Sequence, residues 1–171
     1  MDRTDPGLAS NEKTMMLEFL DDHRATFVQK VTGMTSAELN RTAVPTSALT
    51  LGGLLKHLAH VEDSWLTQRF TGRPIPEPWA SAPFGEDEDW DFHSATDDSP
   101  EDLLARYATA CDRSREVIGR ASFDDESVEF DRGATERYTL RWIVLHLIEE
   151  TARHNGHADL LREAIDGATG E

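Results

Sequence analysis

Two histidines and a glutamate at helical spacing are the residues best suited to chemistry in this 171-residue chain. Glu150 and His154 stand four positions apart, so on one helix they lie one turn apart on the same flank. His57 stands in a second segment of helical periodicity, and its position there faces the apolar side. Helical bundles commonly build metal sites from such inward-facing residues. The spacing therefore predicts a divalent metal ion held by His57, Glu150 and His154.

The donor types indicate which metal this site would hold. Two neutral imidazoles and one carboxylate suit zinc best, with nickel, iron and manganese as alternatives. Three protein ligands leave a position open for water or substrate, as a catalytic site requires. A second interpretation stays open, because Glu-x₃-His is common in helices: Glu150 and His154 form a surface pair, and His57 is a core histidine bonded to a backbone carbonyl.

Four helical segments must position these side chains. Apolar spacing predicts helices over about 10–31, 51–70, 99–119 and 139–165, and no window has the sustained alternation that indicates a sheet. Ser99 and Pro100 form a helix-start signal, and Gly167 a stop. The predicted fold class is all-α, with one domain over residues 1–171 and mobility at residues 1–9.

The connection between the second and third helices, residues 71–98, is far longer than a usual helix–helix turn. It combines acidic residues with four aromatic ones, which favours a strap packed on the bundle over a solvated linker. A disordered acidic tract is the alternative. The aromatic residues are Trp79, Phe84, Trp90 and Phe92.

Charge and composition exclude several classes of function. The chain has 17 Lys and Arg against 33 Asp and Glu, a formal net charge of −16. A protein this acidic is poorly suited to nucleic acid or to anionic membrane surfaces. The polar N-terminal segment has no secretory pattern, so we expect a cytoplasmic protein. Cys111 has no cysteine partner in the sequence and stands on an apolar stripe, which indicates a buried hydrophobic side chain.

Three stretches resemble the DinB superfamily, particularly its actinobacterial branch, across residues 18–167. They are LRWIVLHLIEETARHNGHADLLREAIDG (140–167), LLKHLAHVEDSWL (54–66) and EDEDWDFHSATDDSP (86–100). The resemblance implies a four-helix bundle with a long crossover between the second and third helices. It also implies a metal held by one histidine from the second helix and two residues from the fourth, at the positions of His57, Glu150 and His154.

The same resemblance implies a function. Characterised relatives are largely S-transferases or isomerases that use a small thiol, and mycothiol-dependent maleylpyruvate isomerases share the glutamate at Glu150. Mycothiol is thus the expected co-substrate, with an electrophilic small molecule as the second substrate. His157 stands where many relatives have glutamine and is a candidate catalytic base, fourth ligand or supporting group.

Other functional assignments stay open at this stage. His60 and His146 have no assigned role, although His60 is a second candidate base if it reaches the pocket. A homodimer is compatible with the resemblance. The alternative function is a non-catalytic, metal-dependent module that binds a small ligand or acts in stress, and a third option is a site that has lost its metal.

Overall fold

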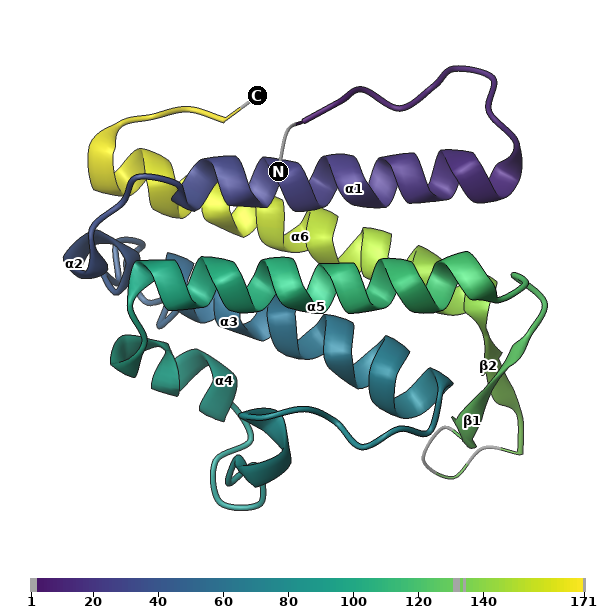
Figure 1. The fold of residues 1–171 in the computed structure, drawn as a ribbon. Helices are drawn as coiled ribbons and strands as arrows, with labels where there is room; N and C mark the ends of the chain where they lie inside the picture. The colour runs from purple at the N-terminus through teal and green to yellow at the C-terminus, as the bar shows by residue number, and fades with distance from the viewer. Residues whose placement is uncertain (1–2, 131–132, 134, 171) are drawn as a thin grey trace.

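The computed structural model describes residues 3–130, 133 and 135–170, and the chain is mainly helical (Figure 1). This confirms the all-α class in its broad form. Helix α1 packs along α6, while α3 packs against both α5 and α6. The main helices are α1 (Glu12–Val31), α3 (Leu51–Glu62), α5 (Pro100–Arg120) and α6 (Leu140–Asp166). Helix α3 continues without a break into the π-helical η1 (Asp63–Phe70).

Side-chain caps fix where these helices begin. Thr50 Oγ1 accepts a hydrogen bond from the Gly53 backbone amide at 3.0 Å, and Ser99 and Thr139 cap α5 and α6 in the same way. Each cap satisfies an amide that the first turn leaves without an intrahelical partner. Gly167 ends α6 at a φ of 79°, a conformation that favours glycine. The observed limits lie within two residues of those predicted from the sequence.

The connection between η1 and α5 lies against α3. It contains η2 (Trp79–Ser81), α4 (Trp90–His93) and η3 (Ser94–Asp97), and the short α2 (Ser36–Leu39) precedes α3. Trp79 Nε1 donates to Asp63 Oδ2 at 2.9 Å, and Lys56 Nζ donates to the Ser94 carbonyl oxygen at 3.1 Å. Buried anchors on α3 and η1 therefore hold this segment, which we call the strap (residues 71–98), against the helices.

A small antiparallel sheet corrects the expectation that the chain has no strands. Strands β1 (Glu126–Phe130) and β2 (Arg137–Thr139) pair with Glu126 opposite Thr139 and Phe130 opposite Arg137, at one end of the helices (Figure 1). Strands of five and three residues contain too few alternations to rise above chance in a sequence. Their pairing depends on contacts between strands and on packing against η1.

Two other expectations, on the domain division and on the N-terminal segment, are not tested by the structure. The division into one domain and the mobility of residues 1–9 stay predictions; residues 1–2 lie outside the described part of the chain. Within that segment, the Gly7 amide donates to Glu18 Oε2 at 2.9 Å. Among the described residues, no helix has the length and apolar character needed to cross a membrane.

Gly156, in the interior of α6, offers a stability prediction. A Cβ at Gly156 would meet no atom within 4 Å, so Gly156→Ala is expected to raise the free energy of unfolding by about 0.5–1 kcal/mol. Urea denaturation followed by circular dichroism measures this. Gly53→Ala is the matched comparison, because there a Cβ would lie 3.2 Å from the Phe92 carbonyl oxygen and 3.3 Å from its ring. An equal gain at both glycines would contradict the role given to close packing at Gly53.

Candidate metal centre

Helices α3 and α6 bring His57, Glu150 and His154 together. One ligand atom from each residue lies within 4.8 Å of the other two. Both imidazole Nε2 atoms converge on Glu150 Oε1, at 3.3 Å from His57 and 3.1 Å from His154. His154 is buried, whereas His57 and Glu150 are half-buried, so the cluster lies at the edge of the seam between the two helices. The three residues that spacing selected are therefore neighbours in space.

Asp91 is a candidate site residue that the sequence reasoning did not single out. It lies on α4, it is buried, and its Oδ2 is 2.9 Å from His57 Nδ1 and 3.0 Å from His60 Nδ1. A carboxylate on Nδ1 holds the histidine proton there and leaves Nε2 free to bind a metal. The acidic strap was visible in the sequence, but no periodicity distinguishes Asp91 from the acidic residues around it.

The strap also covers one side of the cluster with aromatic rings. The Phe92 ring stacks on the His57 imidazole at 4.4 Å between centroids. His60 lies between Phe84 and Trp79, at 4.6 Å and 5.0 Å, and points to Asp91 rather than to the cluster. His60 thus anchors the strap, and through Asp91 it is linked to His57.

The two remaining histidines of α6 differ in their relation to the cluster. His157 Nδ1 lies 3.2 Å from His154 Nδ1, so it contacts the face of His154 that points away from Glu150. His146 instead belongs to an aromatic cluster with Trp65 and Trp142. Trp142 is 46% exposed, so this cluster lies at the surface rather than in the core.

Carboxylates dominate the electrostatics of the cluster. Burial disfavours the charged form of His57, but hydrogen bonds to Asp91 and Glu150 outweigh it and raise the pKa of His57 to about 9. Hydrogen bonds from His154 and His57 hold the pKa of Glu150 far below its ordinary value. Burial and the nearby His154 lower the pKa of His157. The two carboxylates therefore favour a positive charge on the group between them, the position of His57. His157, in contrast, is favoured in its neutral form.

Asp91→Asn is expected to weaken metal binding about tenfold or more, the usual cost of losing a carboxylate that supports a histidine ligand. The amide keeps the size of the side chain but removes its charge from His57 Nδ1. Competition with a fluorescent zinc chelator measures the affinity. Asp89→Asn, two residues away and exposed, serves as the control and should leave the affinity unchanged. Equal affinities in the two variants would remove Asp91 from the site.

Cys111 is buried in the core, as its place on an apolar stripe predicts, and it is not part of the cluster. Burial and the nearby Glu62 charge raise the pKa of its thiol to about 12. The native protein is therefore expected to give no reaction with Ellman's reagent at pH 8 over an hour, while the denatured chain releases about one equivalent. Rapid labelling of the native protein would contradict this assignment.

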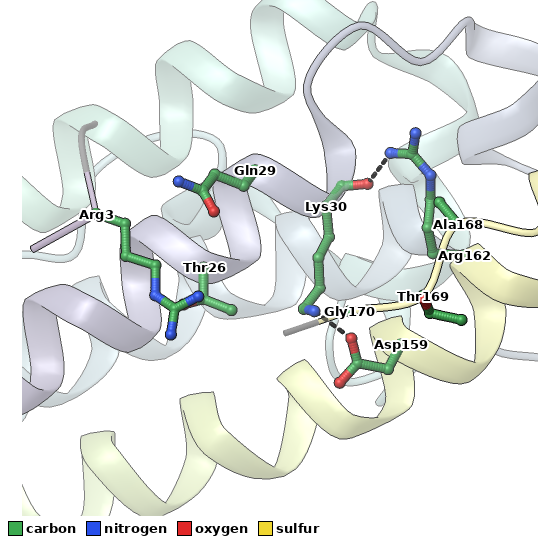
Figure 2. A pocket seen from close by; sticks show the side chains of 9 residues that line it. All are labelled: Arg3, Thr26, Gln29, Lys30, Asp159, Arg162, Ala168, Thr169 and Gly170. Carbon is green, nitrogen blue, oxygen red and sulfur yellow. Dashed lines mark hydrogen bonds and ion pairs between the residues drawn. The ribbon is translucent and has the colours of Figure 1, made fainter. Parts of the chain in front are cut away.

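A separate cavity of about 260 Å³ lies between α1, α6 and the C-terminal segment (Figure 2). Lys30 pairs there with Asp159, and Arg162 donates to the Lys30 carbonyl oxygen at 2.5 Å. None of the three cluster residues lines this cavity. It is an ion-paired surface region rather than an extension of the candidate metal centre.

Comparison with known proteins identifies the family to which the chain belongs. A solved structure titled as a conserved protein of a locus from Enterococcus faecalis is similar in fold, with a TM-score of 0.67 and 20% identity. The match covers 94% of this chain and 100% of that one. No curated protein matches the sequence. The family model for mycothiol S-transferases matches residues 15–167, nearly the whole chain and all three cluster residues. This chain therefore belongs to the mycothiol S-transferase family, a DinB-like family.

Proposed function

We propose that this protein is a divalent-metal-dependent S-transferase or isomerase that uses mycothiol. One observation carries the proposal: in a chain of the mycothiol S-transferase family, His57, Glu150 and His154 present three ligand atoms within 4.8 Å of one another. The proposal includes a four-helix bundle of DinB type, formed by α1, α3 with η1, α5 and α6, with the strap as its crossover.

The separations of the two imidazole Nε2 atoms from Glu150 Oε1 match those of ligands on a tetrahedral metal ion. Two ligands about 2.1 Å from zinc at a tetrahedral angle lie about 3.4 Å apart. The Nε2 atoms of His57 and His154 are 3.3 Å and 3.1 Å from Glu150 Oε1, close to that separation. The Asp91 carboxylate adds a second negative charge beside His57. We therefore propose zinc, with nickel, iron or manganese as the outcomes that metal analysis would distinguish.

His57, Glu150 and His154 would hold the ion, and neighbouring residues orient them. Asp91 accepts the Nδ1 proton of His57, which would leave the Nε2 lone pair for the ion. A bound divalent ion supplies a lowered pKa to a coordinating thiol, and the thiolate is the nucleophilic form. The open side of the cluster would admit an electrophilic carbon for attack by that sulfur.

His157 is the candidate for moving or holding a proton at the site. Its Nδ1 can accept the Nδ1 proton of His154 at 3.2 Å, which would fix the orientation of His154 as Asp91 fixes that of His57. This contact favours a positioning role, and a role as catalytic base requires its Nε2. His157→Gln separates the two roles, because glutamine can accept a hydrogen bond but cannot titrate. A positioning role predicts an unchanged pH profile of kcat/KM. A role as catalytic base predicts that the limb of the profile caused by His157 disappears.

The remaining assignments belong to the same proposal. The electrophile is proposed to be a small molecule, and the protein is expected in the cytoplasm. A homodimer is an expectation carried from the resemblance, and its test is the mass measured by light scattering coupled to size-exclusion chromatography.

Thiol conjugation tests the function directly. The metal-loaded, untagged protein is incubated with mycothiol and monochlorobimane, and bimane fluorescence reports the S–C bond that forms as chloride leaves. Catalysis above the uncatalysed rate that is lost in His154→Ala supports the proposal. Tight binding of mycothiol without turnover would instead support a non-catalytic ligand-binding module. Absence of both would overturn the proposal.

A further inference from the structure

A cavity of about 470 Å³ lies where the segment between α2 and α3 meets the strap. Its volume is in the range of small-molecule sites. Six of its lining residues matter here: Thr42, Leu49, Thr50, Asp89, Phe92 and Thr96. We call it the strap cavity.

Phe92 connects the strap cavity to the metal centre. This residue lines the cavity, and its ring stacks on His57 at 4.4 Å between centroids. Thr50 on the cavity wall precedes His57 by seven residues, about two helical turns or roughly 10 Å along α3. A ligand with one end at His57, Glu150 and His154 could therefore extend past Phe92 into the strap cavity.

The lining does not favour an anionic ligand. Its histidine, His93, is already paired with the Asp87 carboxylate at 2.8 Å. In the described part of the chain no lysine or arginine lines the strap cavity, while the Asp89 carboxylate does. The whole chain carries a net charge of −16, which adds to the repulsion of anions. Glutathione and coenzyme A carry carboxylates or phosphates, and such groups are normally bound by arginine or lysine.

The same lining suits an uncharged ligand rich in hydroxyl groups. Thr42 and Thr96 are exposed and present hydroxyls that can donate and accept. Leu49 and the Phe92 ring supply apolar surface against which the C–H face of a sugar or cyclitol ring can pack. Polar groups on an apolar wall are the usual composition of a pocket that orients a neutral polar ligand.

We propose that the strap cavity binds the uncharged, polyhydroxylated body of the thiol substrate while its sulfur lies at His57, Glu150 and His154. The inference rests on the proposed function, because it takes mycothiol as the thiol. The strap and the segment before α3, rather than the metal ligands, would then determine which thiol binds.

The test compares two thiols with the same reacting group. Mycothiol carries N-acetylcysteine on a glucosaminyl-inositol body, and free N-acetylcysteine lacks that body. In the double variant Thr42→Val and Thr96→Val, the ratio of kcat/KM for mycothiol to that for N-acetylcysteine should fall about tenfold, the effect of losing two neutral hydrogen bonds. Thr169→Val, which removes a hydroxyl from the cavity of Figure 2, is the matched control and should leave the ratio unchanged.

A binding measurement separates failure of the inference from failure of the proposed function. N-acetylglucosaminyl-inositol, the body without its cysteine, is titrated into the full chain by calorimetry and needs no turnover. Binding that weakens in the double variant and in Ala48→Trp, which would fill the cavity, supports the strap cavity even if no thiol is conjugated. Unchanged binding in both variants, or conjugation of mycothiol with an unaltered thiol ratio, would overturn the inference.

Discussion

Untagged protein reconstituted with zinc is expected to retain about one equivalent of metal after dialysis, and Glu150→Ala and His154→Ala are each expected to lose it. Both imidazole Nε2 atoms point to Glu150 Oε1, so removing either partner leaves two donors in a site that needs three. Inductively coupled plasma mass spectrometry gives the metal content. Each substitution is thus expected to remove the whole equivalent of bound metal.

Two neighbours on α6 provide controls for this experiment. Glu149 stands beside Glu150 but is exposed and pairs with Arg153, and His146 stacks on Trp142. Glu149→Ala and His146→Ala should therefore keep the metal. Retention of zinc by Glu150→Ala, or equal loss in the control variants, would assign the metal to another set of residues.

Glu62→Ala is expected to lower the free energy of unfolding by about 3–5 kcal/mol, the usual cost of breaking a buried ion pair by removing one partner. Arg24 would keep only the partly exposed Asp21, to which its Nη1 donates at 2.9 Å. Arg24 on α1 is 1% exposed and Glu62 on α3 is 2% exposed. Arg24 Nε and Nη2 donate to the two carboxylate oxygens at 2.7 Å and 2.6 Å, a bidentate pair. Urea denaturation monitored by circular dichroism measures the loss.

The comparison variants identify the cause of that loss. Glu116→Ala removes the partner of Arg120 in an exposed pair and should change stability by no more than about 0.5 kcal/mol. The double variant Arg24→Met and Glu62→Leu removes both charges and should be more stable than Glu62→Ala alone. A Glu62→Ala variant as stable as Glu116→Ala would contradict the prediction and would show that Asp21, which also accepts from Arg24, is a sufficient partner.

Much of the fold was predictable because its signals are local. Helix limits follow from caps such as Ser99 and Thr139 and from apolar stripes, which act over a few residues. Glu150 and His154 are related by one helical turn, so their proximity follows from helix geometry alone. The hairpin at β1 and β2 was missed because strands this short derive their stability from their partner and from packing.

The sequence by itself determined the helices, the residues capable of binding a metal and the helix faces on which they stand. Only the tertiary structure decided that Asp91 reaches His57 across 34 positions, that Arg24 is buried against Glu62, and that the strap and the segment before α3 line a common cavity. The reason is physical. A helical period repeats along the chain and can be read from it, whereas the path of the strap depends on which buried groups on α3 and η1 its side chains satisfy.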